Sequence, residues 1–296
     1  GIYRVSYVGP ESTAPPPTEP AITPEARLRH ELEAWHGRQD PRAIDAAWPY
    51  LGHPDRFVRW AARTALEHQP PASWKDRAIR ETNPAARVEA LLALTRAAGT
   101  CPSHREPDAV AADTKLGGRI ITSLVEIDWT RLDLARQLGL VRTAEIAMHR
   151  FAPIADAIQA QLREKLEPLF PATGKELNWL LCETLVALRA PTAAAKGVAL
   201  MAAAPTQEEQ IEYARSLRML DTGWTTATRT AYFEWFLKAA NYRGGASFGK
   251  FIEFIRADAV KTLTDGERST LAAVLEQKPK PMGVIENLGF AFAGRS

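Results

Sequence analysis

Cysteine is almost absent from this 296-residue chain, which holds only Cys101 and Cys182. Two cysteines cannot build a disulfide framework or hold an iron–sulfur cluster. Covalent haem requires Cys-x-x-Cys-His, and Cys101-Pro-Ser-His104 supplies one thiol at the wrong spacing. The six histidines form neither His-x-x-x-His nor His-Glu-x-x-His. We therefore expect no cofactor and no metal in this chain. Cys182 is expected in the core, and a disulfide between the two cysteines stays open.

Long apolar runs and an excess of charge of one sign are also missing. No stretch of eighteen apolar residues lacks a charge, so the sequence predicts no membrane span. The 37 Lys and Arg against 35 Asp and Glu leave a formal net charge of +2, whereas a nucleic-acid groove usually needs clustered positive charge. Phosphate-binding glycine loops and nucleophile elbows are absent as well. We therefore predict that this chain itself is not an enzyme.

Apolar residues make up 46% of the chain and charged residues 24%, which is typical of a globular protein. Residues 2–8 alternate like a single strand whose partner lies in another domain. The chain begins at Gly1 without a signal-peptide pattern, so we interpret it as a processed chain or a piece of a longer protein. We divide it into an extended strand and proline-rich linker over 1–23, a helical repeat domain over 24–277 and an extended linker over 278–296.

Between Pro24 and Gln277 the apolar residues follow a helical period, and proline and glycine separate the periodic segments. No strand pattern intervenes, so the predicted fold class is all-α. The pattern predicts helices over 24–36, 41–51, 56–69, 73–81, 84–98, 118–127, 130–138, 141–149, 153–167, 174–189, 191–203, 207–219, 225–241, 247–263 and 265–276. Thr264-Asp-Gly-Glu267 is a capping box, which marks the start of the last of these helices.

An internal repeat of thirty residues lies in the first third of the chain. Pro54-Asp-Arg-Phe-Val-Arg59 returns as Pro84-Ala-Ala-Arg-Val-Glu89. A polar residue that can cap a helix stands before each proline, His53 in the first unit and Asn83 in the second. The pattern predicts that each unit is a helical hairpin and that its second helix is the more apolar of the two. Because two short helices cannot bury their faces alone, such hairpins must stack on one another.

The first unit carries the residues Pro54-Asp55, Val58-Arg59, Ala61-Ala62 and Ala65-Leu66. With these residues it resembles the HEAT repeat family. The resemblance covers two units, about residues 40–98, and departs from the family at Glu89, where a basic residue is usual. It implies an α-solenoid of HEAT-like helical hairpins that scaffolds or binds other proteins.

A second resemblance covers most of the chain. It rests on Leu28-Arg-His-Glu-Leu-Glu-Ala-Trp-His36, Trp48-Pro-Tyr-Leu-Gly-His-Pro-Asp-Arg-Phe57, Ala62-Arg-Thr-Ala-Leu-Glu-His68, Ala204-Pro-Thr-Gln-Glu-Glu-Gln210, Thr222-Gly-Trp-Thr225 and Tyr232-Phe-Glu-Trp-Phe236. These segments look like the helical part of large exported proteins of planctomycetes and acidobacteria. There the helical part follows a β-propeller resembling quinoprotein sugar dehydrogenases and precedes a c-type cytochrome domain. The resemblance implies a periplasmic or extracellular location and an oxidoreductase parent. It also implies the propeller and cytochrome domains as partners, and it assigns the redox chemistry to them.

Aromatic residues gather near the C-terminal end of the helical region. The candidate partner-binding residues are Trp224, Tyr232, Trp235, Tyr242 and Arg243. Tyr232 and Trp235 share one face of a predicted helix. Such a stripe more often packs inside a hairpin, but aromatic residues beside an arginine are also enriched at the centres of interfaces. The sequence leaves both roles open, a packed core and a docking patch.

Arginine clusters on the predicted inner helices, at Arg56, Arg59, Arg63, Arg77, Arg80 and Arg87. We interpret these residues as ion-pair partners that link one repeat to the next. The alternative is a groove for an anionic partner, as in HEAT-like nucleic-acid-binding proteins and DNA-glycosylase-type enzymes.

The predicted function is a non-catalytic scaffold, spacer and protein-interaction module of a larger exported dehydrogenase–cytochrome protein, with no nucleic-acid partner. A third hypothesis, besides this one and the anionic groove, is a hydrolase assembled from scattered residues.

Overall fold

In the computed structural model the described residues are 3–15, 22–101, 103 and 111–280. Every regular element within these ranges is a helix, which confirms the all-α prediction for this part of the chain. The α-helices are α1 (Pro24–Glu33), α2 (Arg42–Ala47), α3 (Arg56–Glu67), α4 (Lys75–Ile79), α5 (Pro84–Ala98), α6 (Thr114–Val125), α7 (Leu134–Arg150), α8 (Asp156–Leu166), α9 (Lys175–Ala187), α10 (Ala193–Ala203), α11 (Gln207–Leu217), α12 (Thr226–Ala239), α13 (Phe248–Lys261), α14 (Asp265–Thr270) and α15 (Ala272–Glu276). Short 3-10 turns are η1 (Trp48–Tyr50), η2 (Pro71–Ser73), η4 (Trp129–Arg131) and η5 (Glu167–Leu169).

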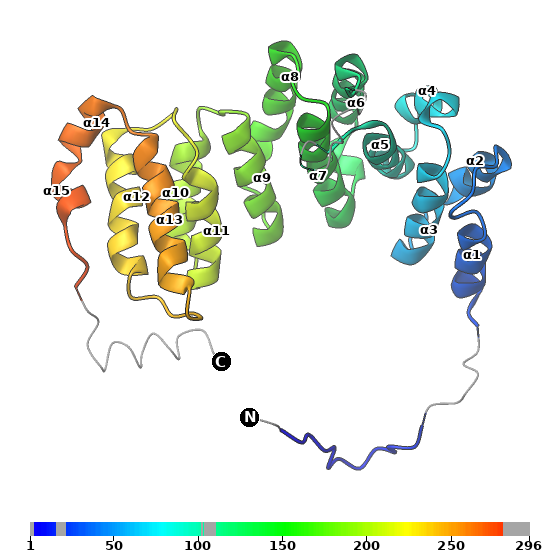
Figure 1. Ribbon diagram of the computed structural model, residues 1–296, viewed down its shortest axis with the longest axis horizontal. Coiled ribbons are helices and arrows are strands. Elements are labelled where there is room, and N and C mark those ends of the chain that lie inside the picture. The colour runs from blue at the N-terminus through cyan, green and yellow to red at the C-terminus, as the bar shows by residue number, and fades with distance from the viewer. Residues whose placement is uncertain (1–2, 16–21, 102, 104–110, 281–296) are drawn as a thin grey trace.

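The helices pack in two layers that follow the order of the chain. In one layer α1, α3, α5, α7, α9 and α11 contact one another in sequence. In the other layer α4, α6 and α8 contact one another and lie against α5, α7 and α9. The row of helices bends into an arc (Figure 1), and one hydrophobic core continues from Leu32 in α1 to Val274 in α15. Each helix is thus held mainly by its neighbours in the chain.

Side-chain caps begin the second helix of each repeated unit. Asn83 accepts hydrogen bonds from two backbone N–H groups in the first turn of α5, as predicted. In the first unit the cap is Asp55 and not His53, because the Asp55 carboxylate lies next to the first turn of α3 and accepts two of its N–H groups. The His53 ring accepts the backbone N–H of Asp55 instead, at 3.1 Å. The two units therefore start their helices with different residues at different positions.

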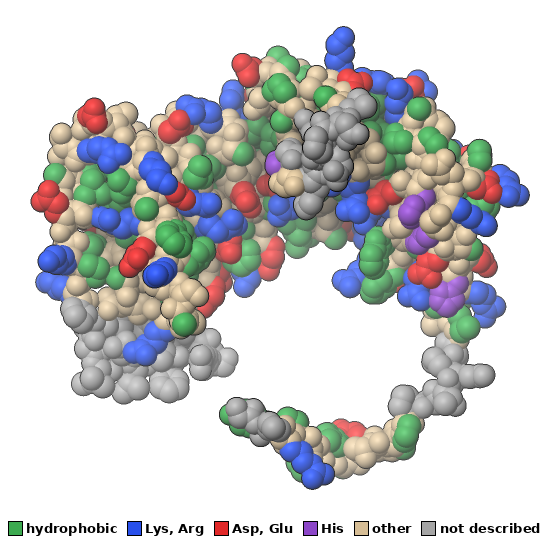
Figure 2. Space-filling view, viewed as in Figure 1, with side chains coloured by type: hydrophobic (Ala, Val, Ile, Leu, Met, Phe, Trp, Pro, Cys, Tyr) green, Lys and Arg blue, Asp and Glu red, His purple; other side chains and the backbone are tan. Residues whose placement is uncertain are grey.

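Ion pairs connect consecutive helices of the same layer. Arg59 and Arg63 of α3 both reach Glu89 of α5, at 3.4 and 2.9 Å. Arg59 and Glu89 are thirty residues apart, so the same position carries opposite charges in the two units. Arg77 pairs with Asp45 between the two repeated units, and Arg87 of α5 pairs with Glu126 at the end of α6, both at less than 3 Å. The ion-pair interpretation is confirmed for these four arginines, and basic and acidic side chains are interspersed over the face in Figure 2.

The predicted number of helices is wrong at two places. Most of the predicted helix 130–138 and all of 141–149 belong to one helix, α7, which begins at Leu134 and continues through Gly139. A Cβ atom at Gly139 would lie 3.3 Å from Val88, so this glycine lets α7 approach α5 closely and does not end a helix. Conversely, the predicted helix 265–276 is divided at Leu271, where the backbone leaves helical geometry and the side chain turns into the core.

The predicted N-terminal strand over residues 2–8 has no partner within the described part of the chain, and its pairing with another domain stays a prediction. Residues 3–8 have no regular structure, and the side chains of Tyr3, Val5 and Val8 are 88 to 95% exposed. A strand needs a neighbour for its backbone N–H and C=O groups, and no described segment supplies one. Within the described residues the first helix begins at Pro24 and the last ends at Glu276. Most of the predicted C-terminal linker, 281–296, lies outside the described residues.

Candidate functional site

The aromatic residues predicted as a docking patch are mostly inside the protein. Tyr232, Trp235 and Tyr242 are buried between α11, α12 and the turn after α12. The hydroxyl of Tyr232 donates to the carbonyl of Ala214 at 2.8 Å, while the Trp235 indole N–H and the Tyr242 hydroxyl both donate to the side chain of Gln210. Their polar groups are therefore satisfied within the core, as the packing interpretation predicts.

Trp224 and Arg243 are the two accessible members of this set. Trp224 is half-buried, its indole N–H donates to the carbonyl of Leu220, and the guanidinium of Arg229 lies 4.2 Å from its ring centroid. Arg243 is exposed on the turn after α12, where its backbone is hydrogen-bonded to Gln207. The structure thus does not gather the five predicted residues on one exposed surface, and their partner-binding role stays a prediction.

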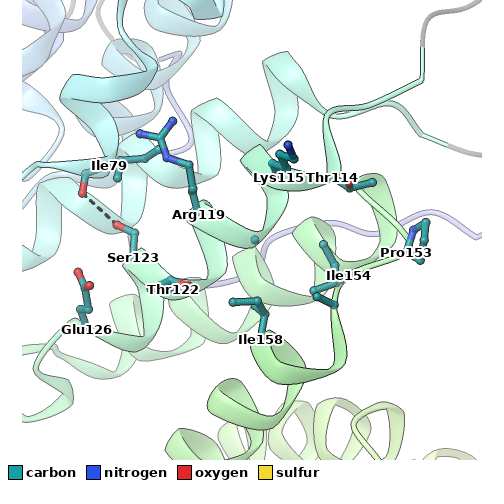
Figure 3. A pocket seen from close by; sticks show the side chains of 12 residues that line it. Ile79, Thr114, Lys115, Arg119, Thr122, Ser123, Glu126, Pro153, Ile154 and Ile158 are labelled. Atoms are coloured by element: carbon teal, nitrogen blue, oxygen red, sulfur yellow. Dashed lines mark hydrogen bonds between the residues drawn. The ribbon is translucent and has the colours of Figure 1, made fainter.

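An apolar groove of about 610 Å³ lies between α6 and α8 (Figure 3). Ile154 and Ile158 form one wall from the α8 side, α6 forms the other, and Ile79 closes one end beside Ser123. The Ser123 hydroxyl donates to the carbonyl of Ile79 at 3.2 Å, which ties α6 to the end of α4. The groove is open to solvent and its lining is mainly apolar. Its shape and chemistry fit the apolar side of another helix.

Two glycines explain why the groove forms at this place. A Cβ atom at Gly117 would lie 2.4 Å from Cβ of Phe151, so α6 contacts the chain before α8 through a position that has no side chain. The next residue, Gly118, faces the groove, and a Cβ atom there would meet only Ile158, at 3.8 Å. The first glycine therefore permits helix packing, and the second leaves the floor of the groove open.

The rim of the groove carries charges from α6. Arg119 pairs with Asp76 of α4 at 2.7 Å, and Glu126 pairs with Arg87 of α5 at 2.6 Å. Lys115 is exposed, and no carboxylate of the described residues lies within 4 Å of its ammonium group. One positive charge at the rim is therefore available to an acidic group of a partner.

A second site lies between α7 and α9, where two adjoining cavities of about 690 and 470 Å³ share Arg142 and Glu183 in their walls. The Glu145 side chain on α7 is 15% exposed and pairs with Arg142 at 2.6 Å. Its other carboxylate oxygen lies 2.5 Å from the hydroxyl oxygen of Thr184 on α9. Burial raises the pKa of Glu145 to about 7, against the hydrogen bond from Thr184 and the charge of Arg142.

The hydrogen-bond geometry around Thr184 fits either protonation state of Glu145, because the Thr184 hydroxyl can donate to the carboxylate or accept from the protonated carboxyl. The Thr184 hydroxyl oxygen also lies 2.8 Å from the carbonyl of Leu180, one turn earlier in α9. A hydroxyl has a single hydrogen and cannot donate in both directions. When that hydrogen points to Leu180, the short contact with Glu145 requires a proton on the carboxyl group, which then donates to Thr184. The site therefore offers the proton on Glu145 a hydrogen-bond acceptor.

Cys182 is buried in α9 as predicted; burial raises the pKa of its thiol to about 12, and it forms no disulfide with Cys101. Over residues 3–15, 22–101, 103 and 111–280, no group of three or more His, Cys, Asp or Glu side chains is placed to hold a metal ion. None of the helices in these ranges has the length and apolar character that crossing a bilayer requires.

Comparison with known proteins yields no match for this chain, neither among protein-family models nor among curated proteins or solved structures.

Proposed function

We propose that this chain is a non-catalytic scaffold and spacer, an α-solenoid of HEAT-like hairpins that also binds protein partners. The thirty-residue repeat and the packing of each helix on its chain neighbours support this architecture. A continuous core and ion pairs between units are the contacts by which the array would hold its two ends at a defined distance. By the resemblance described above, the neighbours would be a dehydrogenase-like propeller and a c-type cytochrome domain of one exported polypeptide.

The apolar groove between α6 and α8 is the observation that carries the interaction role. Its walls, with Ile154 and Ile158, suit the apolar stripe of an amphipathic helix, which recurs every three to four residues. Helix α6 has twelve residues and is about 18 Å long, enough to contact three turns of a bound helix. The occupant we propose is an amphipathic helix of a neighbouring domain, with an acidic residue opposite Lys115.

Site-specific crosslinking in the full-length parent protein tests this proposal. A photoreactive benzoylphenylalanine replaces Gly118, where a side chain meets only Ile158 and projects into the groove. The matched control carries the same residue in place of Gly245, where a Cβ atom would contact nothing within 4 Å. We expect residue 118 to crosslink to an amphipathic, helical segment of a flanking domain, and residue 245 to give no such product. Equal products from both positions, or none from residue 118, would contradict the docking role.

The sequence of the full open reading frame that encodes this chain tests whether the two proposed neighbouring domains are present. A propeller sequence before this segment and Cys-x-x-Cys-His after it would agree with the proposed parent. A frame that encodes neither would remove the redox part of the proposal and leave the scaffold role to be judged on crosslinking alone.

The alternative function, nucleic-acid binding or DNA-glycosylase-type chemistry, has no observation in its favour. Four of the six clustered arginines already pair with carboxylates, which lowers the charge available to phosphates. Retention on duplex DNA at low salt that weakens steeply as salt rises would restore this alternative.

A further inference from the structure

The larger cavity between α7 and α9 carries more guanidinium groups than accessible carboxylates. Arg142 and Arg150 line it together with Arg96. Arg150 donates to two carbonyl groups at the end of α5, and no carboxylate of the described residues lies within 4 Å of it. Arg96 pairs with Glu67 at 2.8 Å. Among the described residues, Glu145 is the one carboxylate that pairs with Arg142. The positive charge of Arg142 is therefore compensated by Glu145 alone.

The groups facing Glu145 come from three helices. Arg142 and His149 lie one turn before and after it on α7, Thr184 and Glu183 face it from α9, and Arg215 acts on it from α11. Glu183 lies 3.6 Å from Arg215, which also pairs with Glu212 at 3.0 Å. When Glu145 takes up a proton, Arg142 loses its carboxylate partner. The Arg142 side chain, which is 56% exposed, lines both cavities.

We propose that this cleft binds an acidic segment of a partner protein, whose carboxylate pairs with Arg142 while Glu145 takes up one proton from solvent. The partner carboxylate replaces Glu145 as the ion-pair partner, and the protonated Glu145 donates to Thr184. Ile146, Met148 and Ala187 supply apolar contacts for the residues beside the acidic group. This inference adds a second partner class to the proposed interaction role. It uses none of the residues of the α6–α8 groove, so either proposal can fail while the other stands.

Proton uptake sets the size of the expected pH effect. With the Glu145 pKa near 7, the protonated fraction is about one-tenth at pH 8 and about nine-tenths at pH 6. The apparent affinity scales with the fraction of protein in the competent state. An acidic partner should therefore bind about tenfold more tightly at pH 6 than at pH 8.

The test measures binding of an end-capped eight-residue peptide of alternating Glu and Ala by isothermal titration calorimetry, at pH 6 and pH 8 and one ionic strength. Wild-type protein should show the tenfold difference. Glu145→Gln imitates the protonated carboxyl and should bind with equal affinity at both pH values, which separates Glu145 from His149 as the titrating group. Arg142→Gln should lose about tenfold or more at pH 6, since a charge-assisted hydrogen bond is removed.

A matched control removes one arginine elsewhere. Arg131 is exposed in η4 and makes no ion pair with the described residues, so Arg131→Gln should leave binding unchanged. The proposal is overturned if wild-type protein does not bind the peptide at pH 6, if binding is equal at both pH values, or if Arg131→Gln weakens binding as much as Arg142→Gln. Competition by inorganic phosphate at the peptide's own concentration would show a small-anion site and would overturn the assignment to a protein segment. Thermal unfolding of each variant confirms that it is folded.

Discussion

The buried carboxyl of Glu145 leads to a specific prediction for folding stability. Its pKa is about 7 in the folded protein and 4.5 for an ordinary glutamate. The folded state therefore holds this proton more tightly than the unfolded state does. The stabilisation from this proton is present in full below about pH 4.5 and is lost as the pH rises through 7. The difference between the two pKa values corresponds to about 3 kcal/mol of unfolding free energy.

Glu145→Gln removes the titration and keeps the shape of the side chain. Because glutamine resembles the protonated carboxyl, the variant and the wild type should be about equally stable near pH 4.5. At pH 8 the variant should be the more stable protein, by up to about 3 kcal/mol. Urea unfolding followed by far-ultraviolet circular dichroism, at several pH values between 5 and 8, measures this difference. Other titrating groups contribute equally to both proteins and cancel.

An exposed glutamate provides the control. Glu164 lies on the solvent side of α8, and Glu164→Gln should leave the pH dependence of stability as it is in the wild type. If the stability difference between Glu145→Gln and the wild type stays constant from pH 5 to 8, the buried carboxyl does not take up a proton in this range. The proton-linked binding would then be refuted.

Three further predictions concern the packing of the helices. Gly117→Ala should lower the free energy of unfolding by about 1–3 kcal/mol in urea titrations, because its Cβ atom would overlap Phe151; unchanged stability would mean that α6 shifts freely. Asn83→Ala removes the cap of α5 and should destabilise the protein by about 1 kcal/mol in the same assay, with Asn83→Asp as the variant that retains the cap. A double-mutant cycle with Arg59→Met and Glu89→Gln should give a coupling free energy of about 1 kcal/mol, since both side chains are less than one-fifth exposed; additive effects would show that this ion pair does not hold α3 to α5.

The helices were predictable because each buries one face, so that apolar residues recur every three to four positions in the sequence. The prediction 84–98 coincides with α5, and 207–219 exceeds α11 by two residues. The failure at Gly139 has a different origin. A glycine within a periodic segment is compatible with a helix end and with close helix packing. The choice depends on Val88 of α5, a residue that local sequence does not connect with α7.

Neither candidate site could be derived from the sequence, since each combines residues from separate helices. Ile79, Gly118 and Ile158 become neighbours only when α4, α6 and α8 pack together. Glu145 and Thr184 are 39 residues apart. One local signal was available for the groove, the pair Gly117–Gly118, because glycine weakens a helix unless close contact requires it. The prediction 118–127 put this pair at a helix start, whereas α6 begins at Thr114. For the aromatic stripe near Tyr232, spacing alone could not distinguish burial from exposure.

The opposite charges at positions 59 and 89 make the two repeated units non-interchangeable. If the first unit were duplicated in tandem, the arginine of one copy would face the arginine of the next, and like charges at such close range repel. The charges therefore disfavour lengthening of the array by simple duplication of either unit.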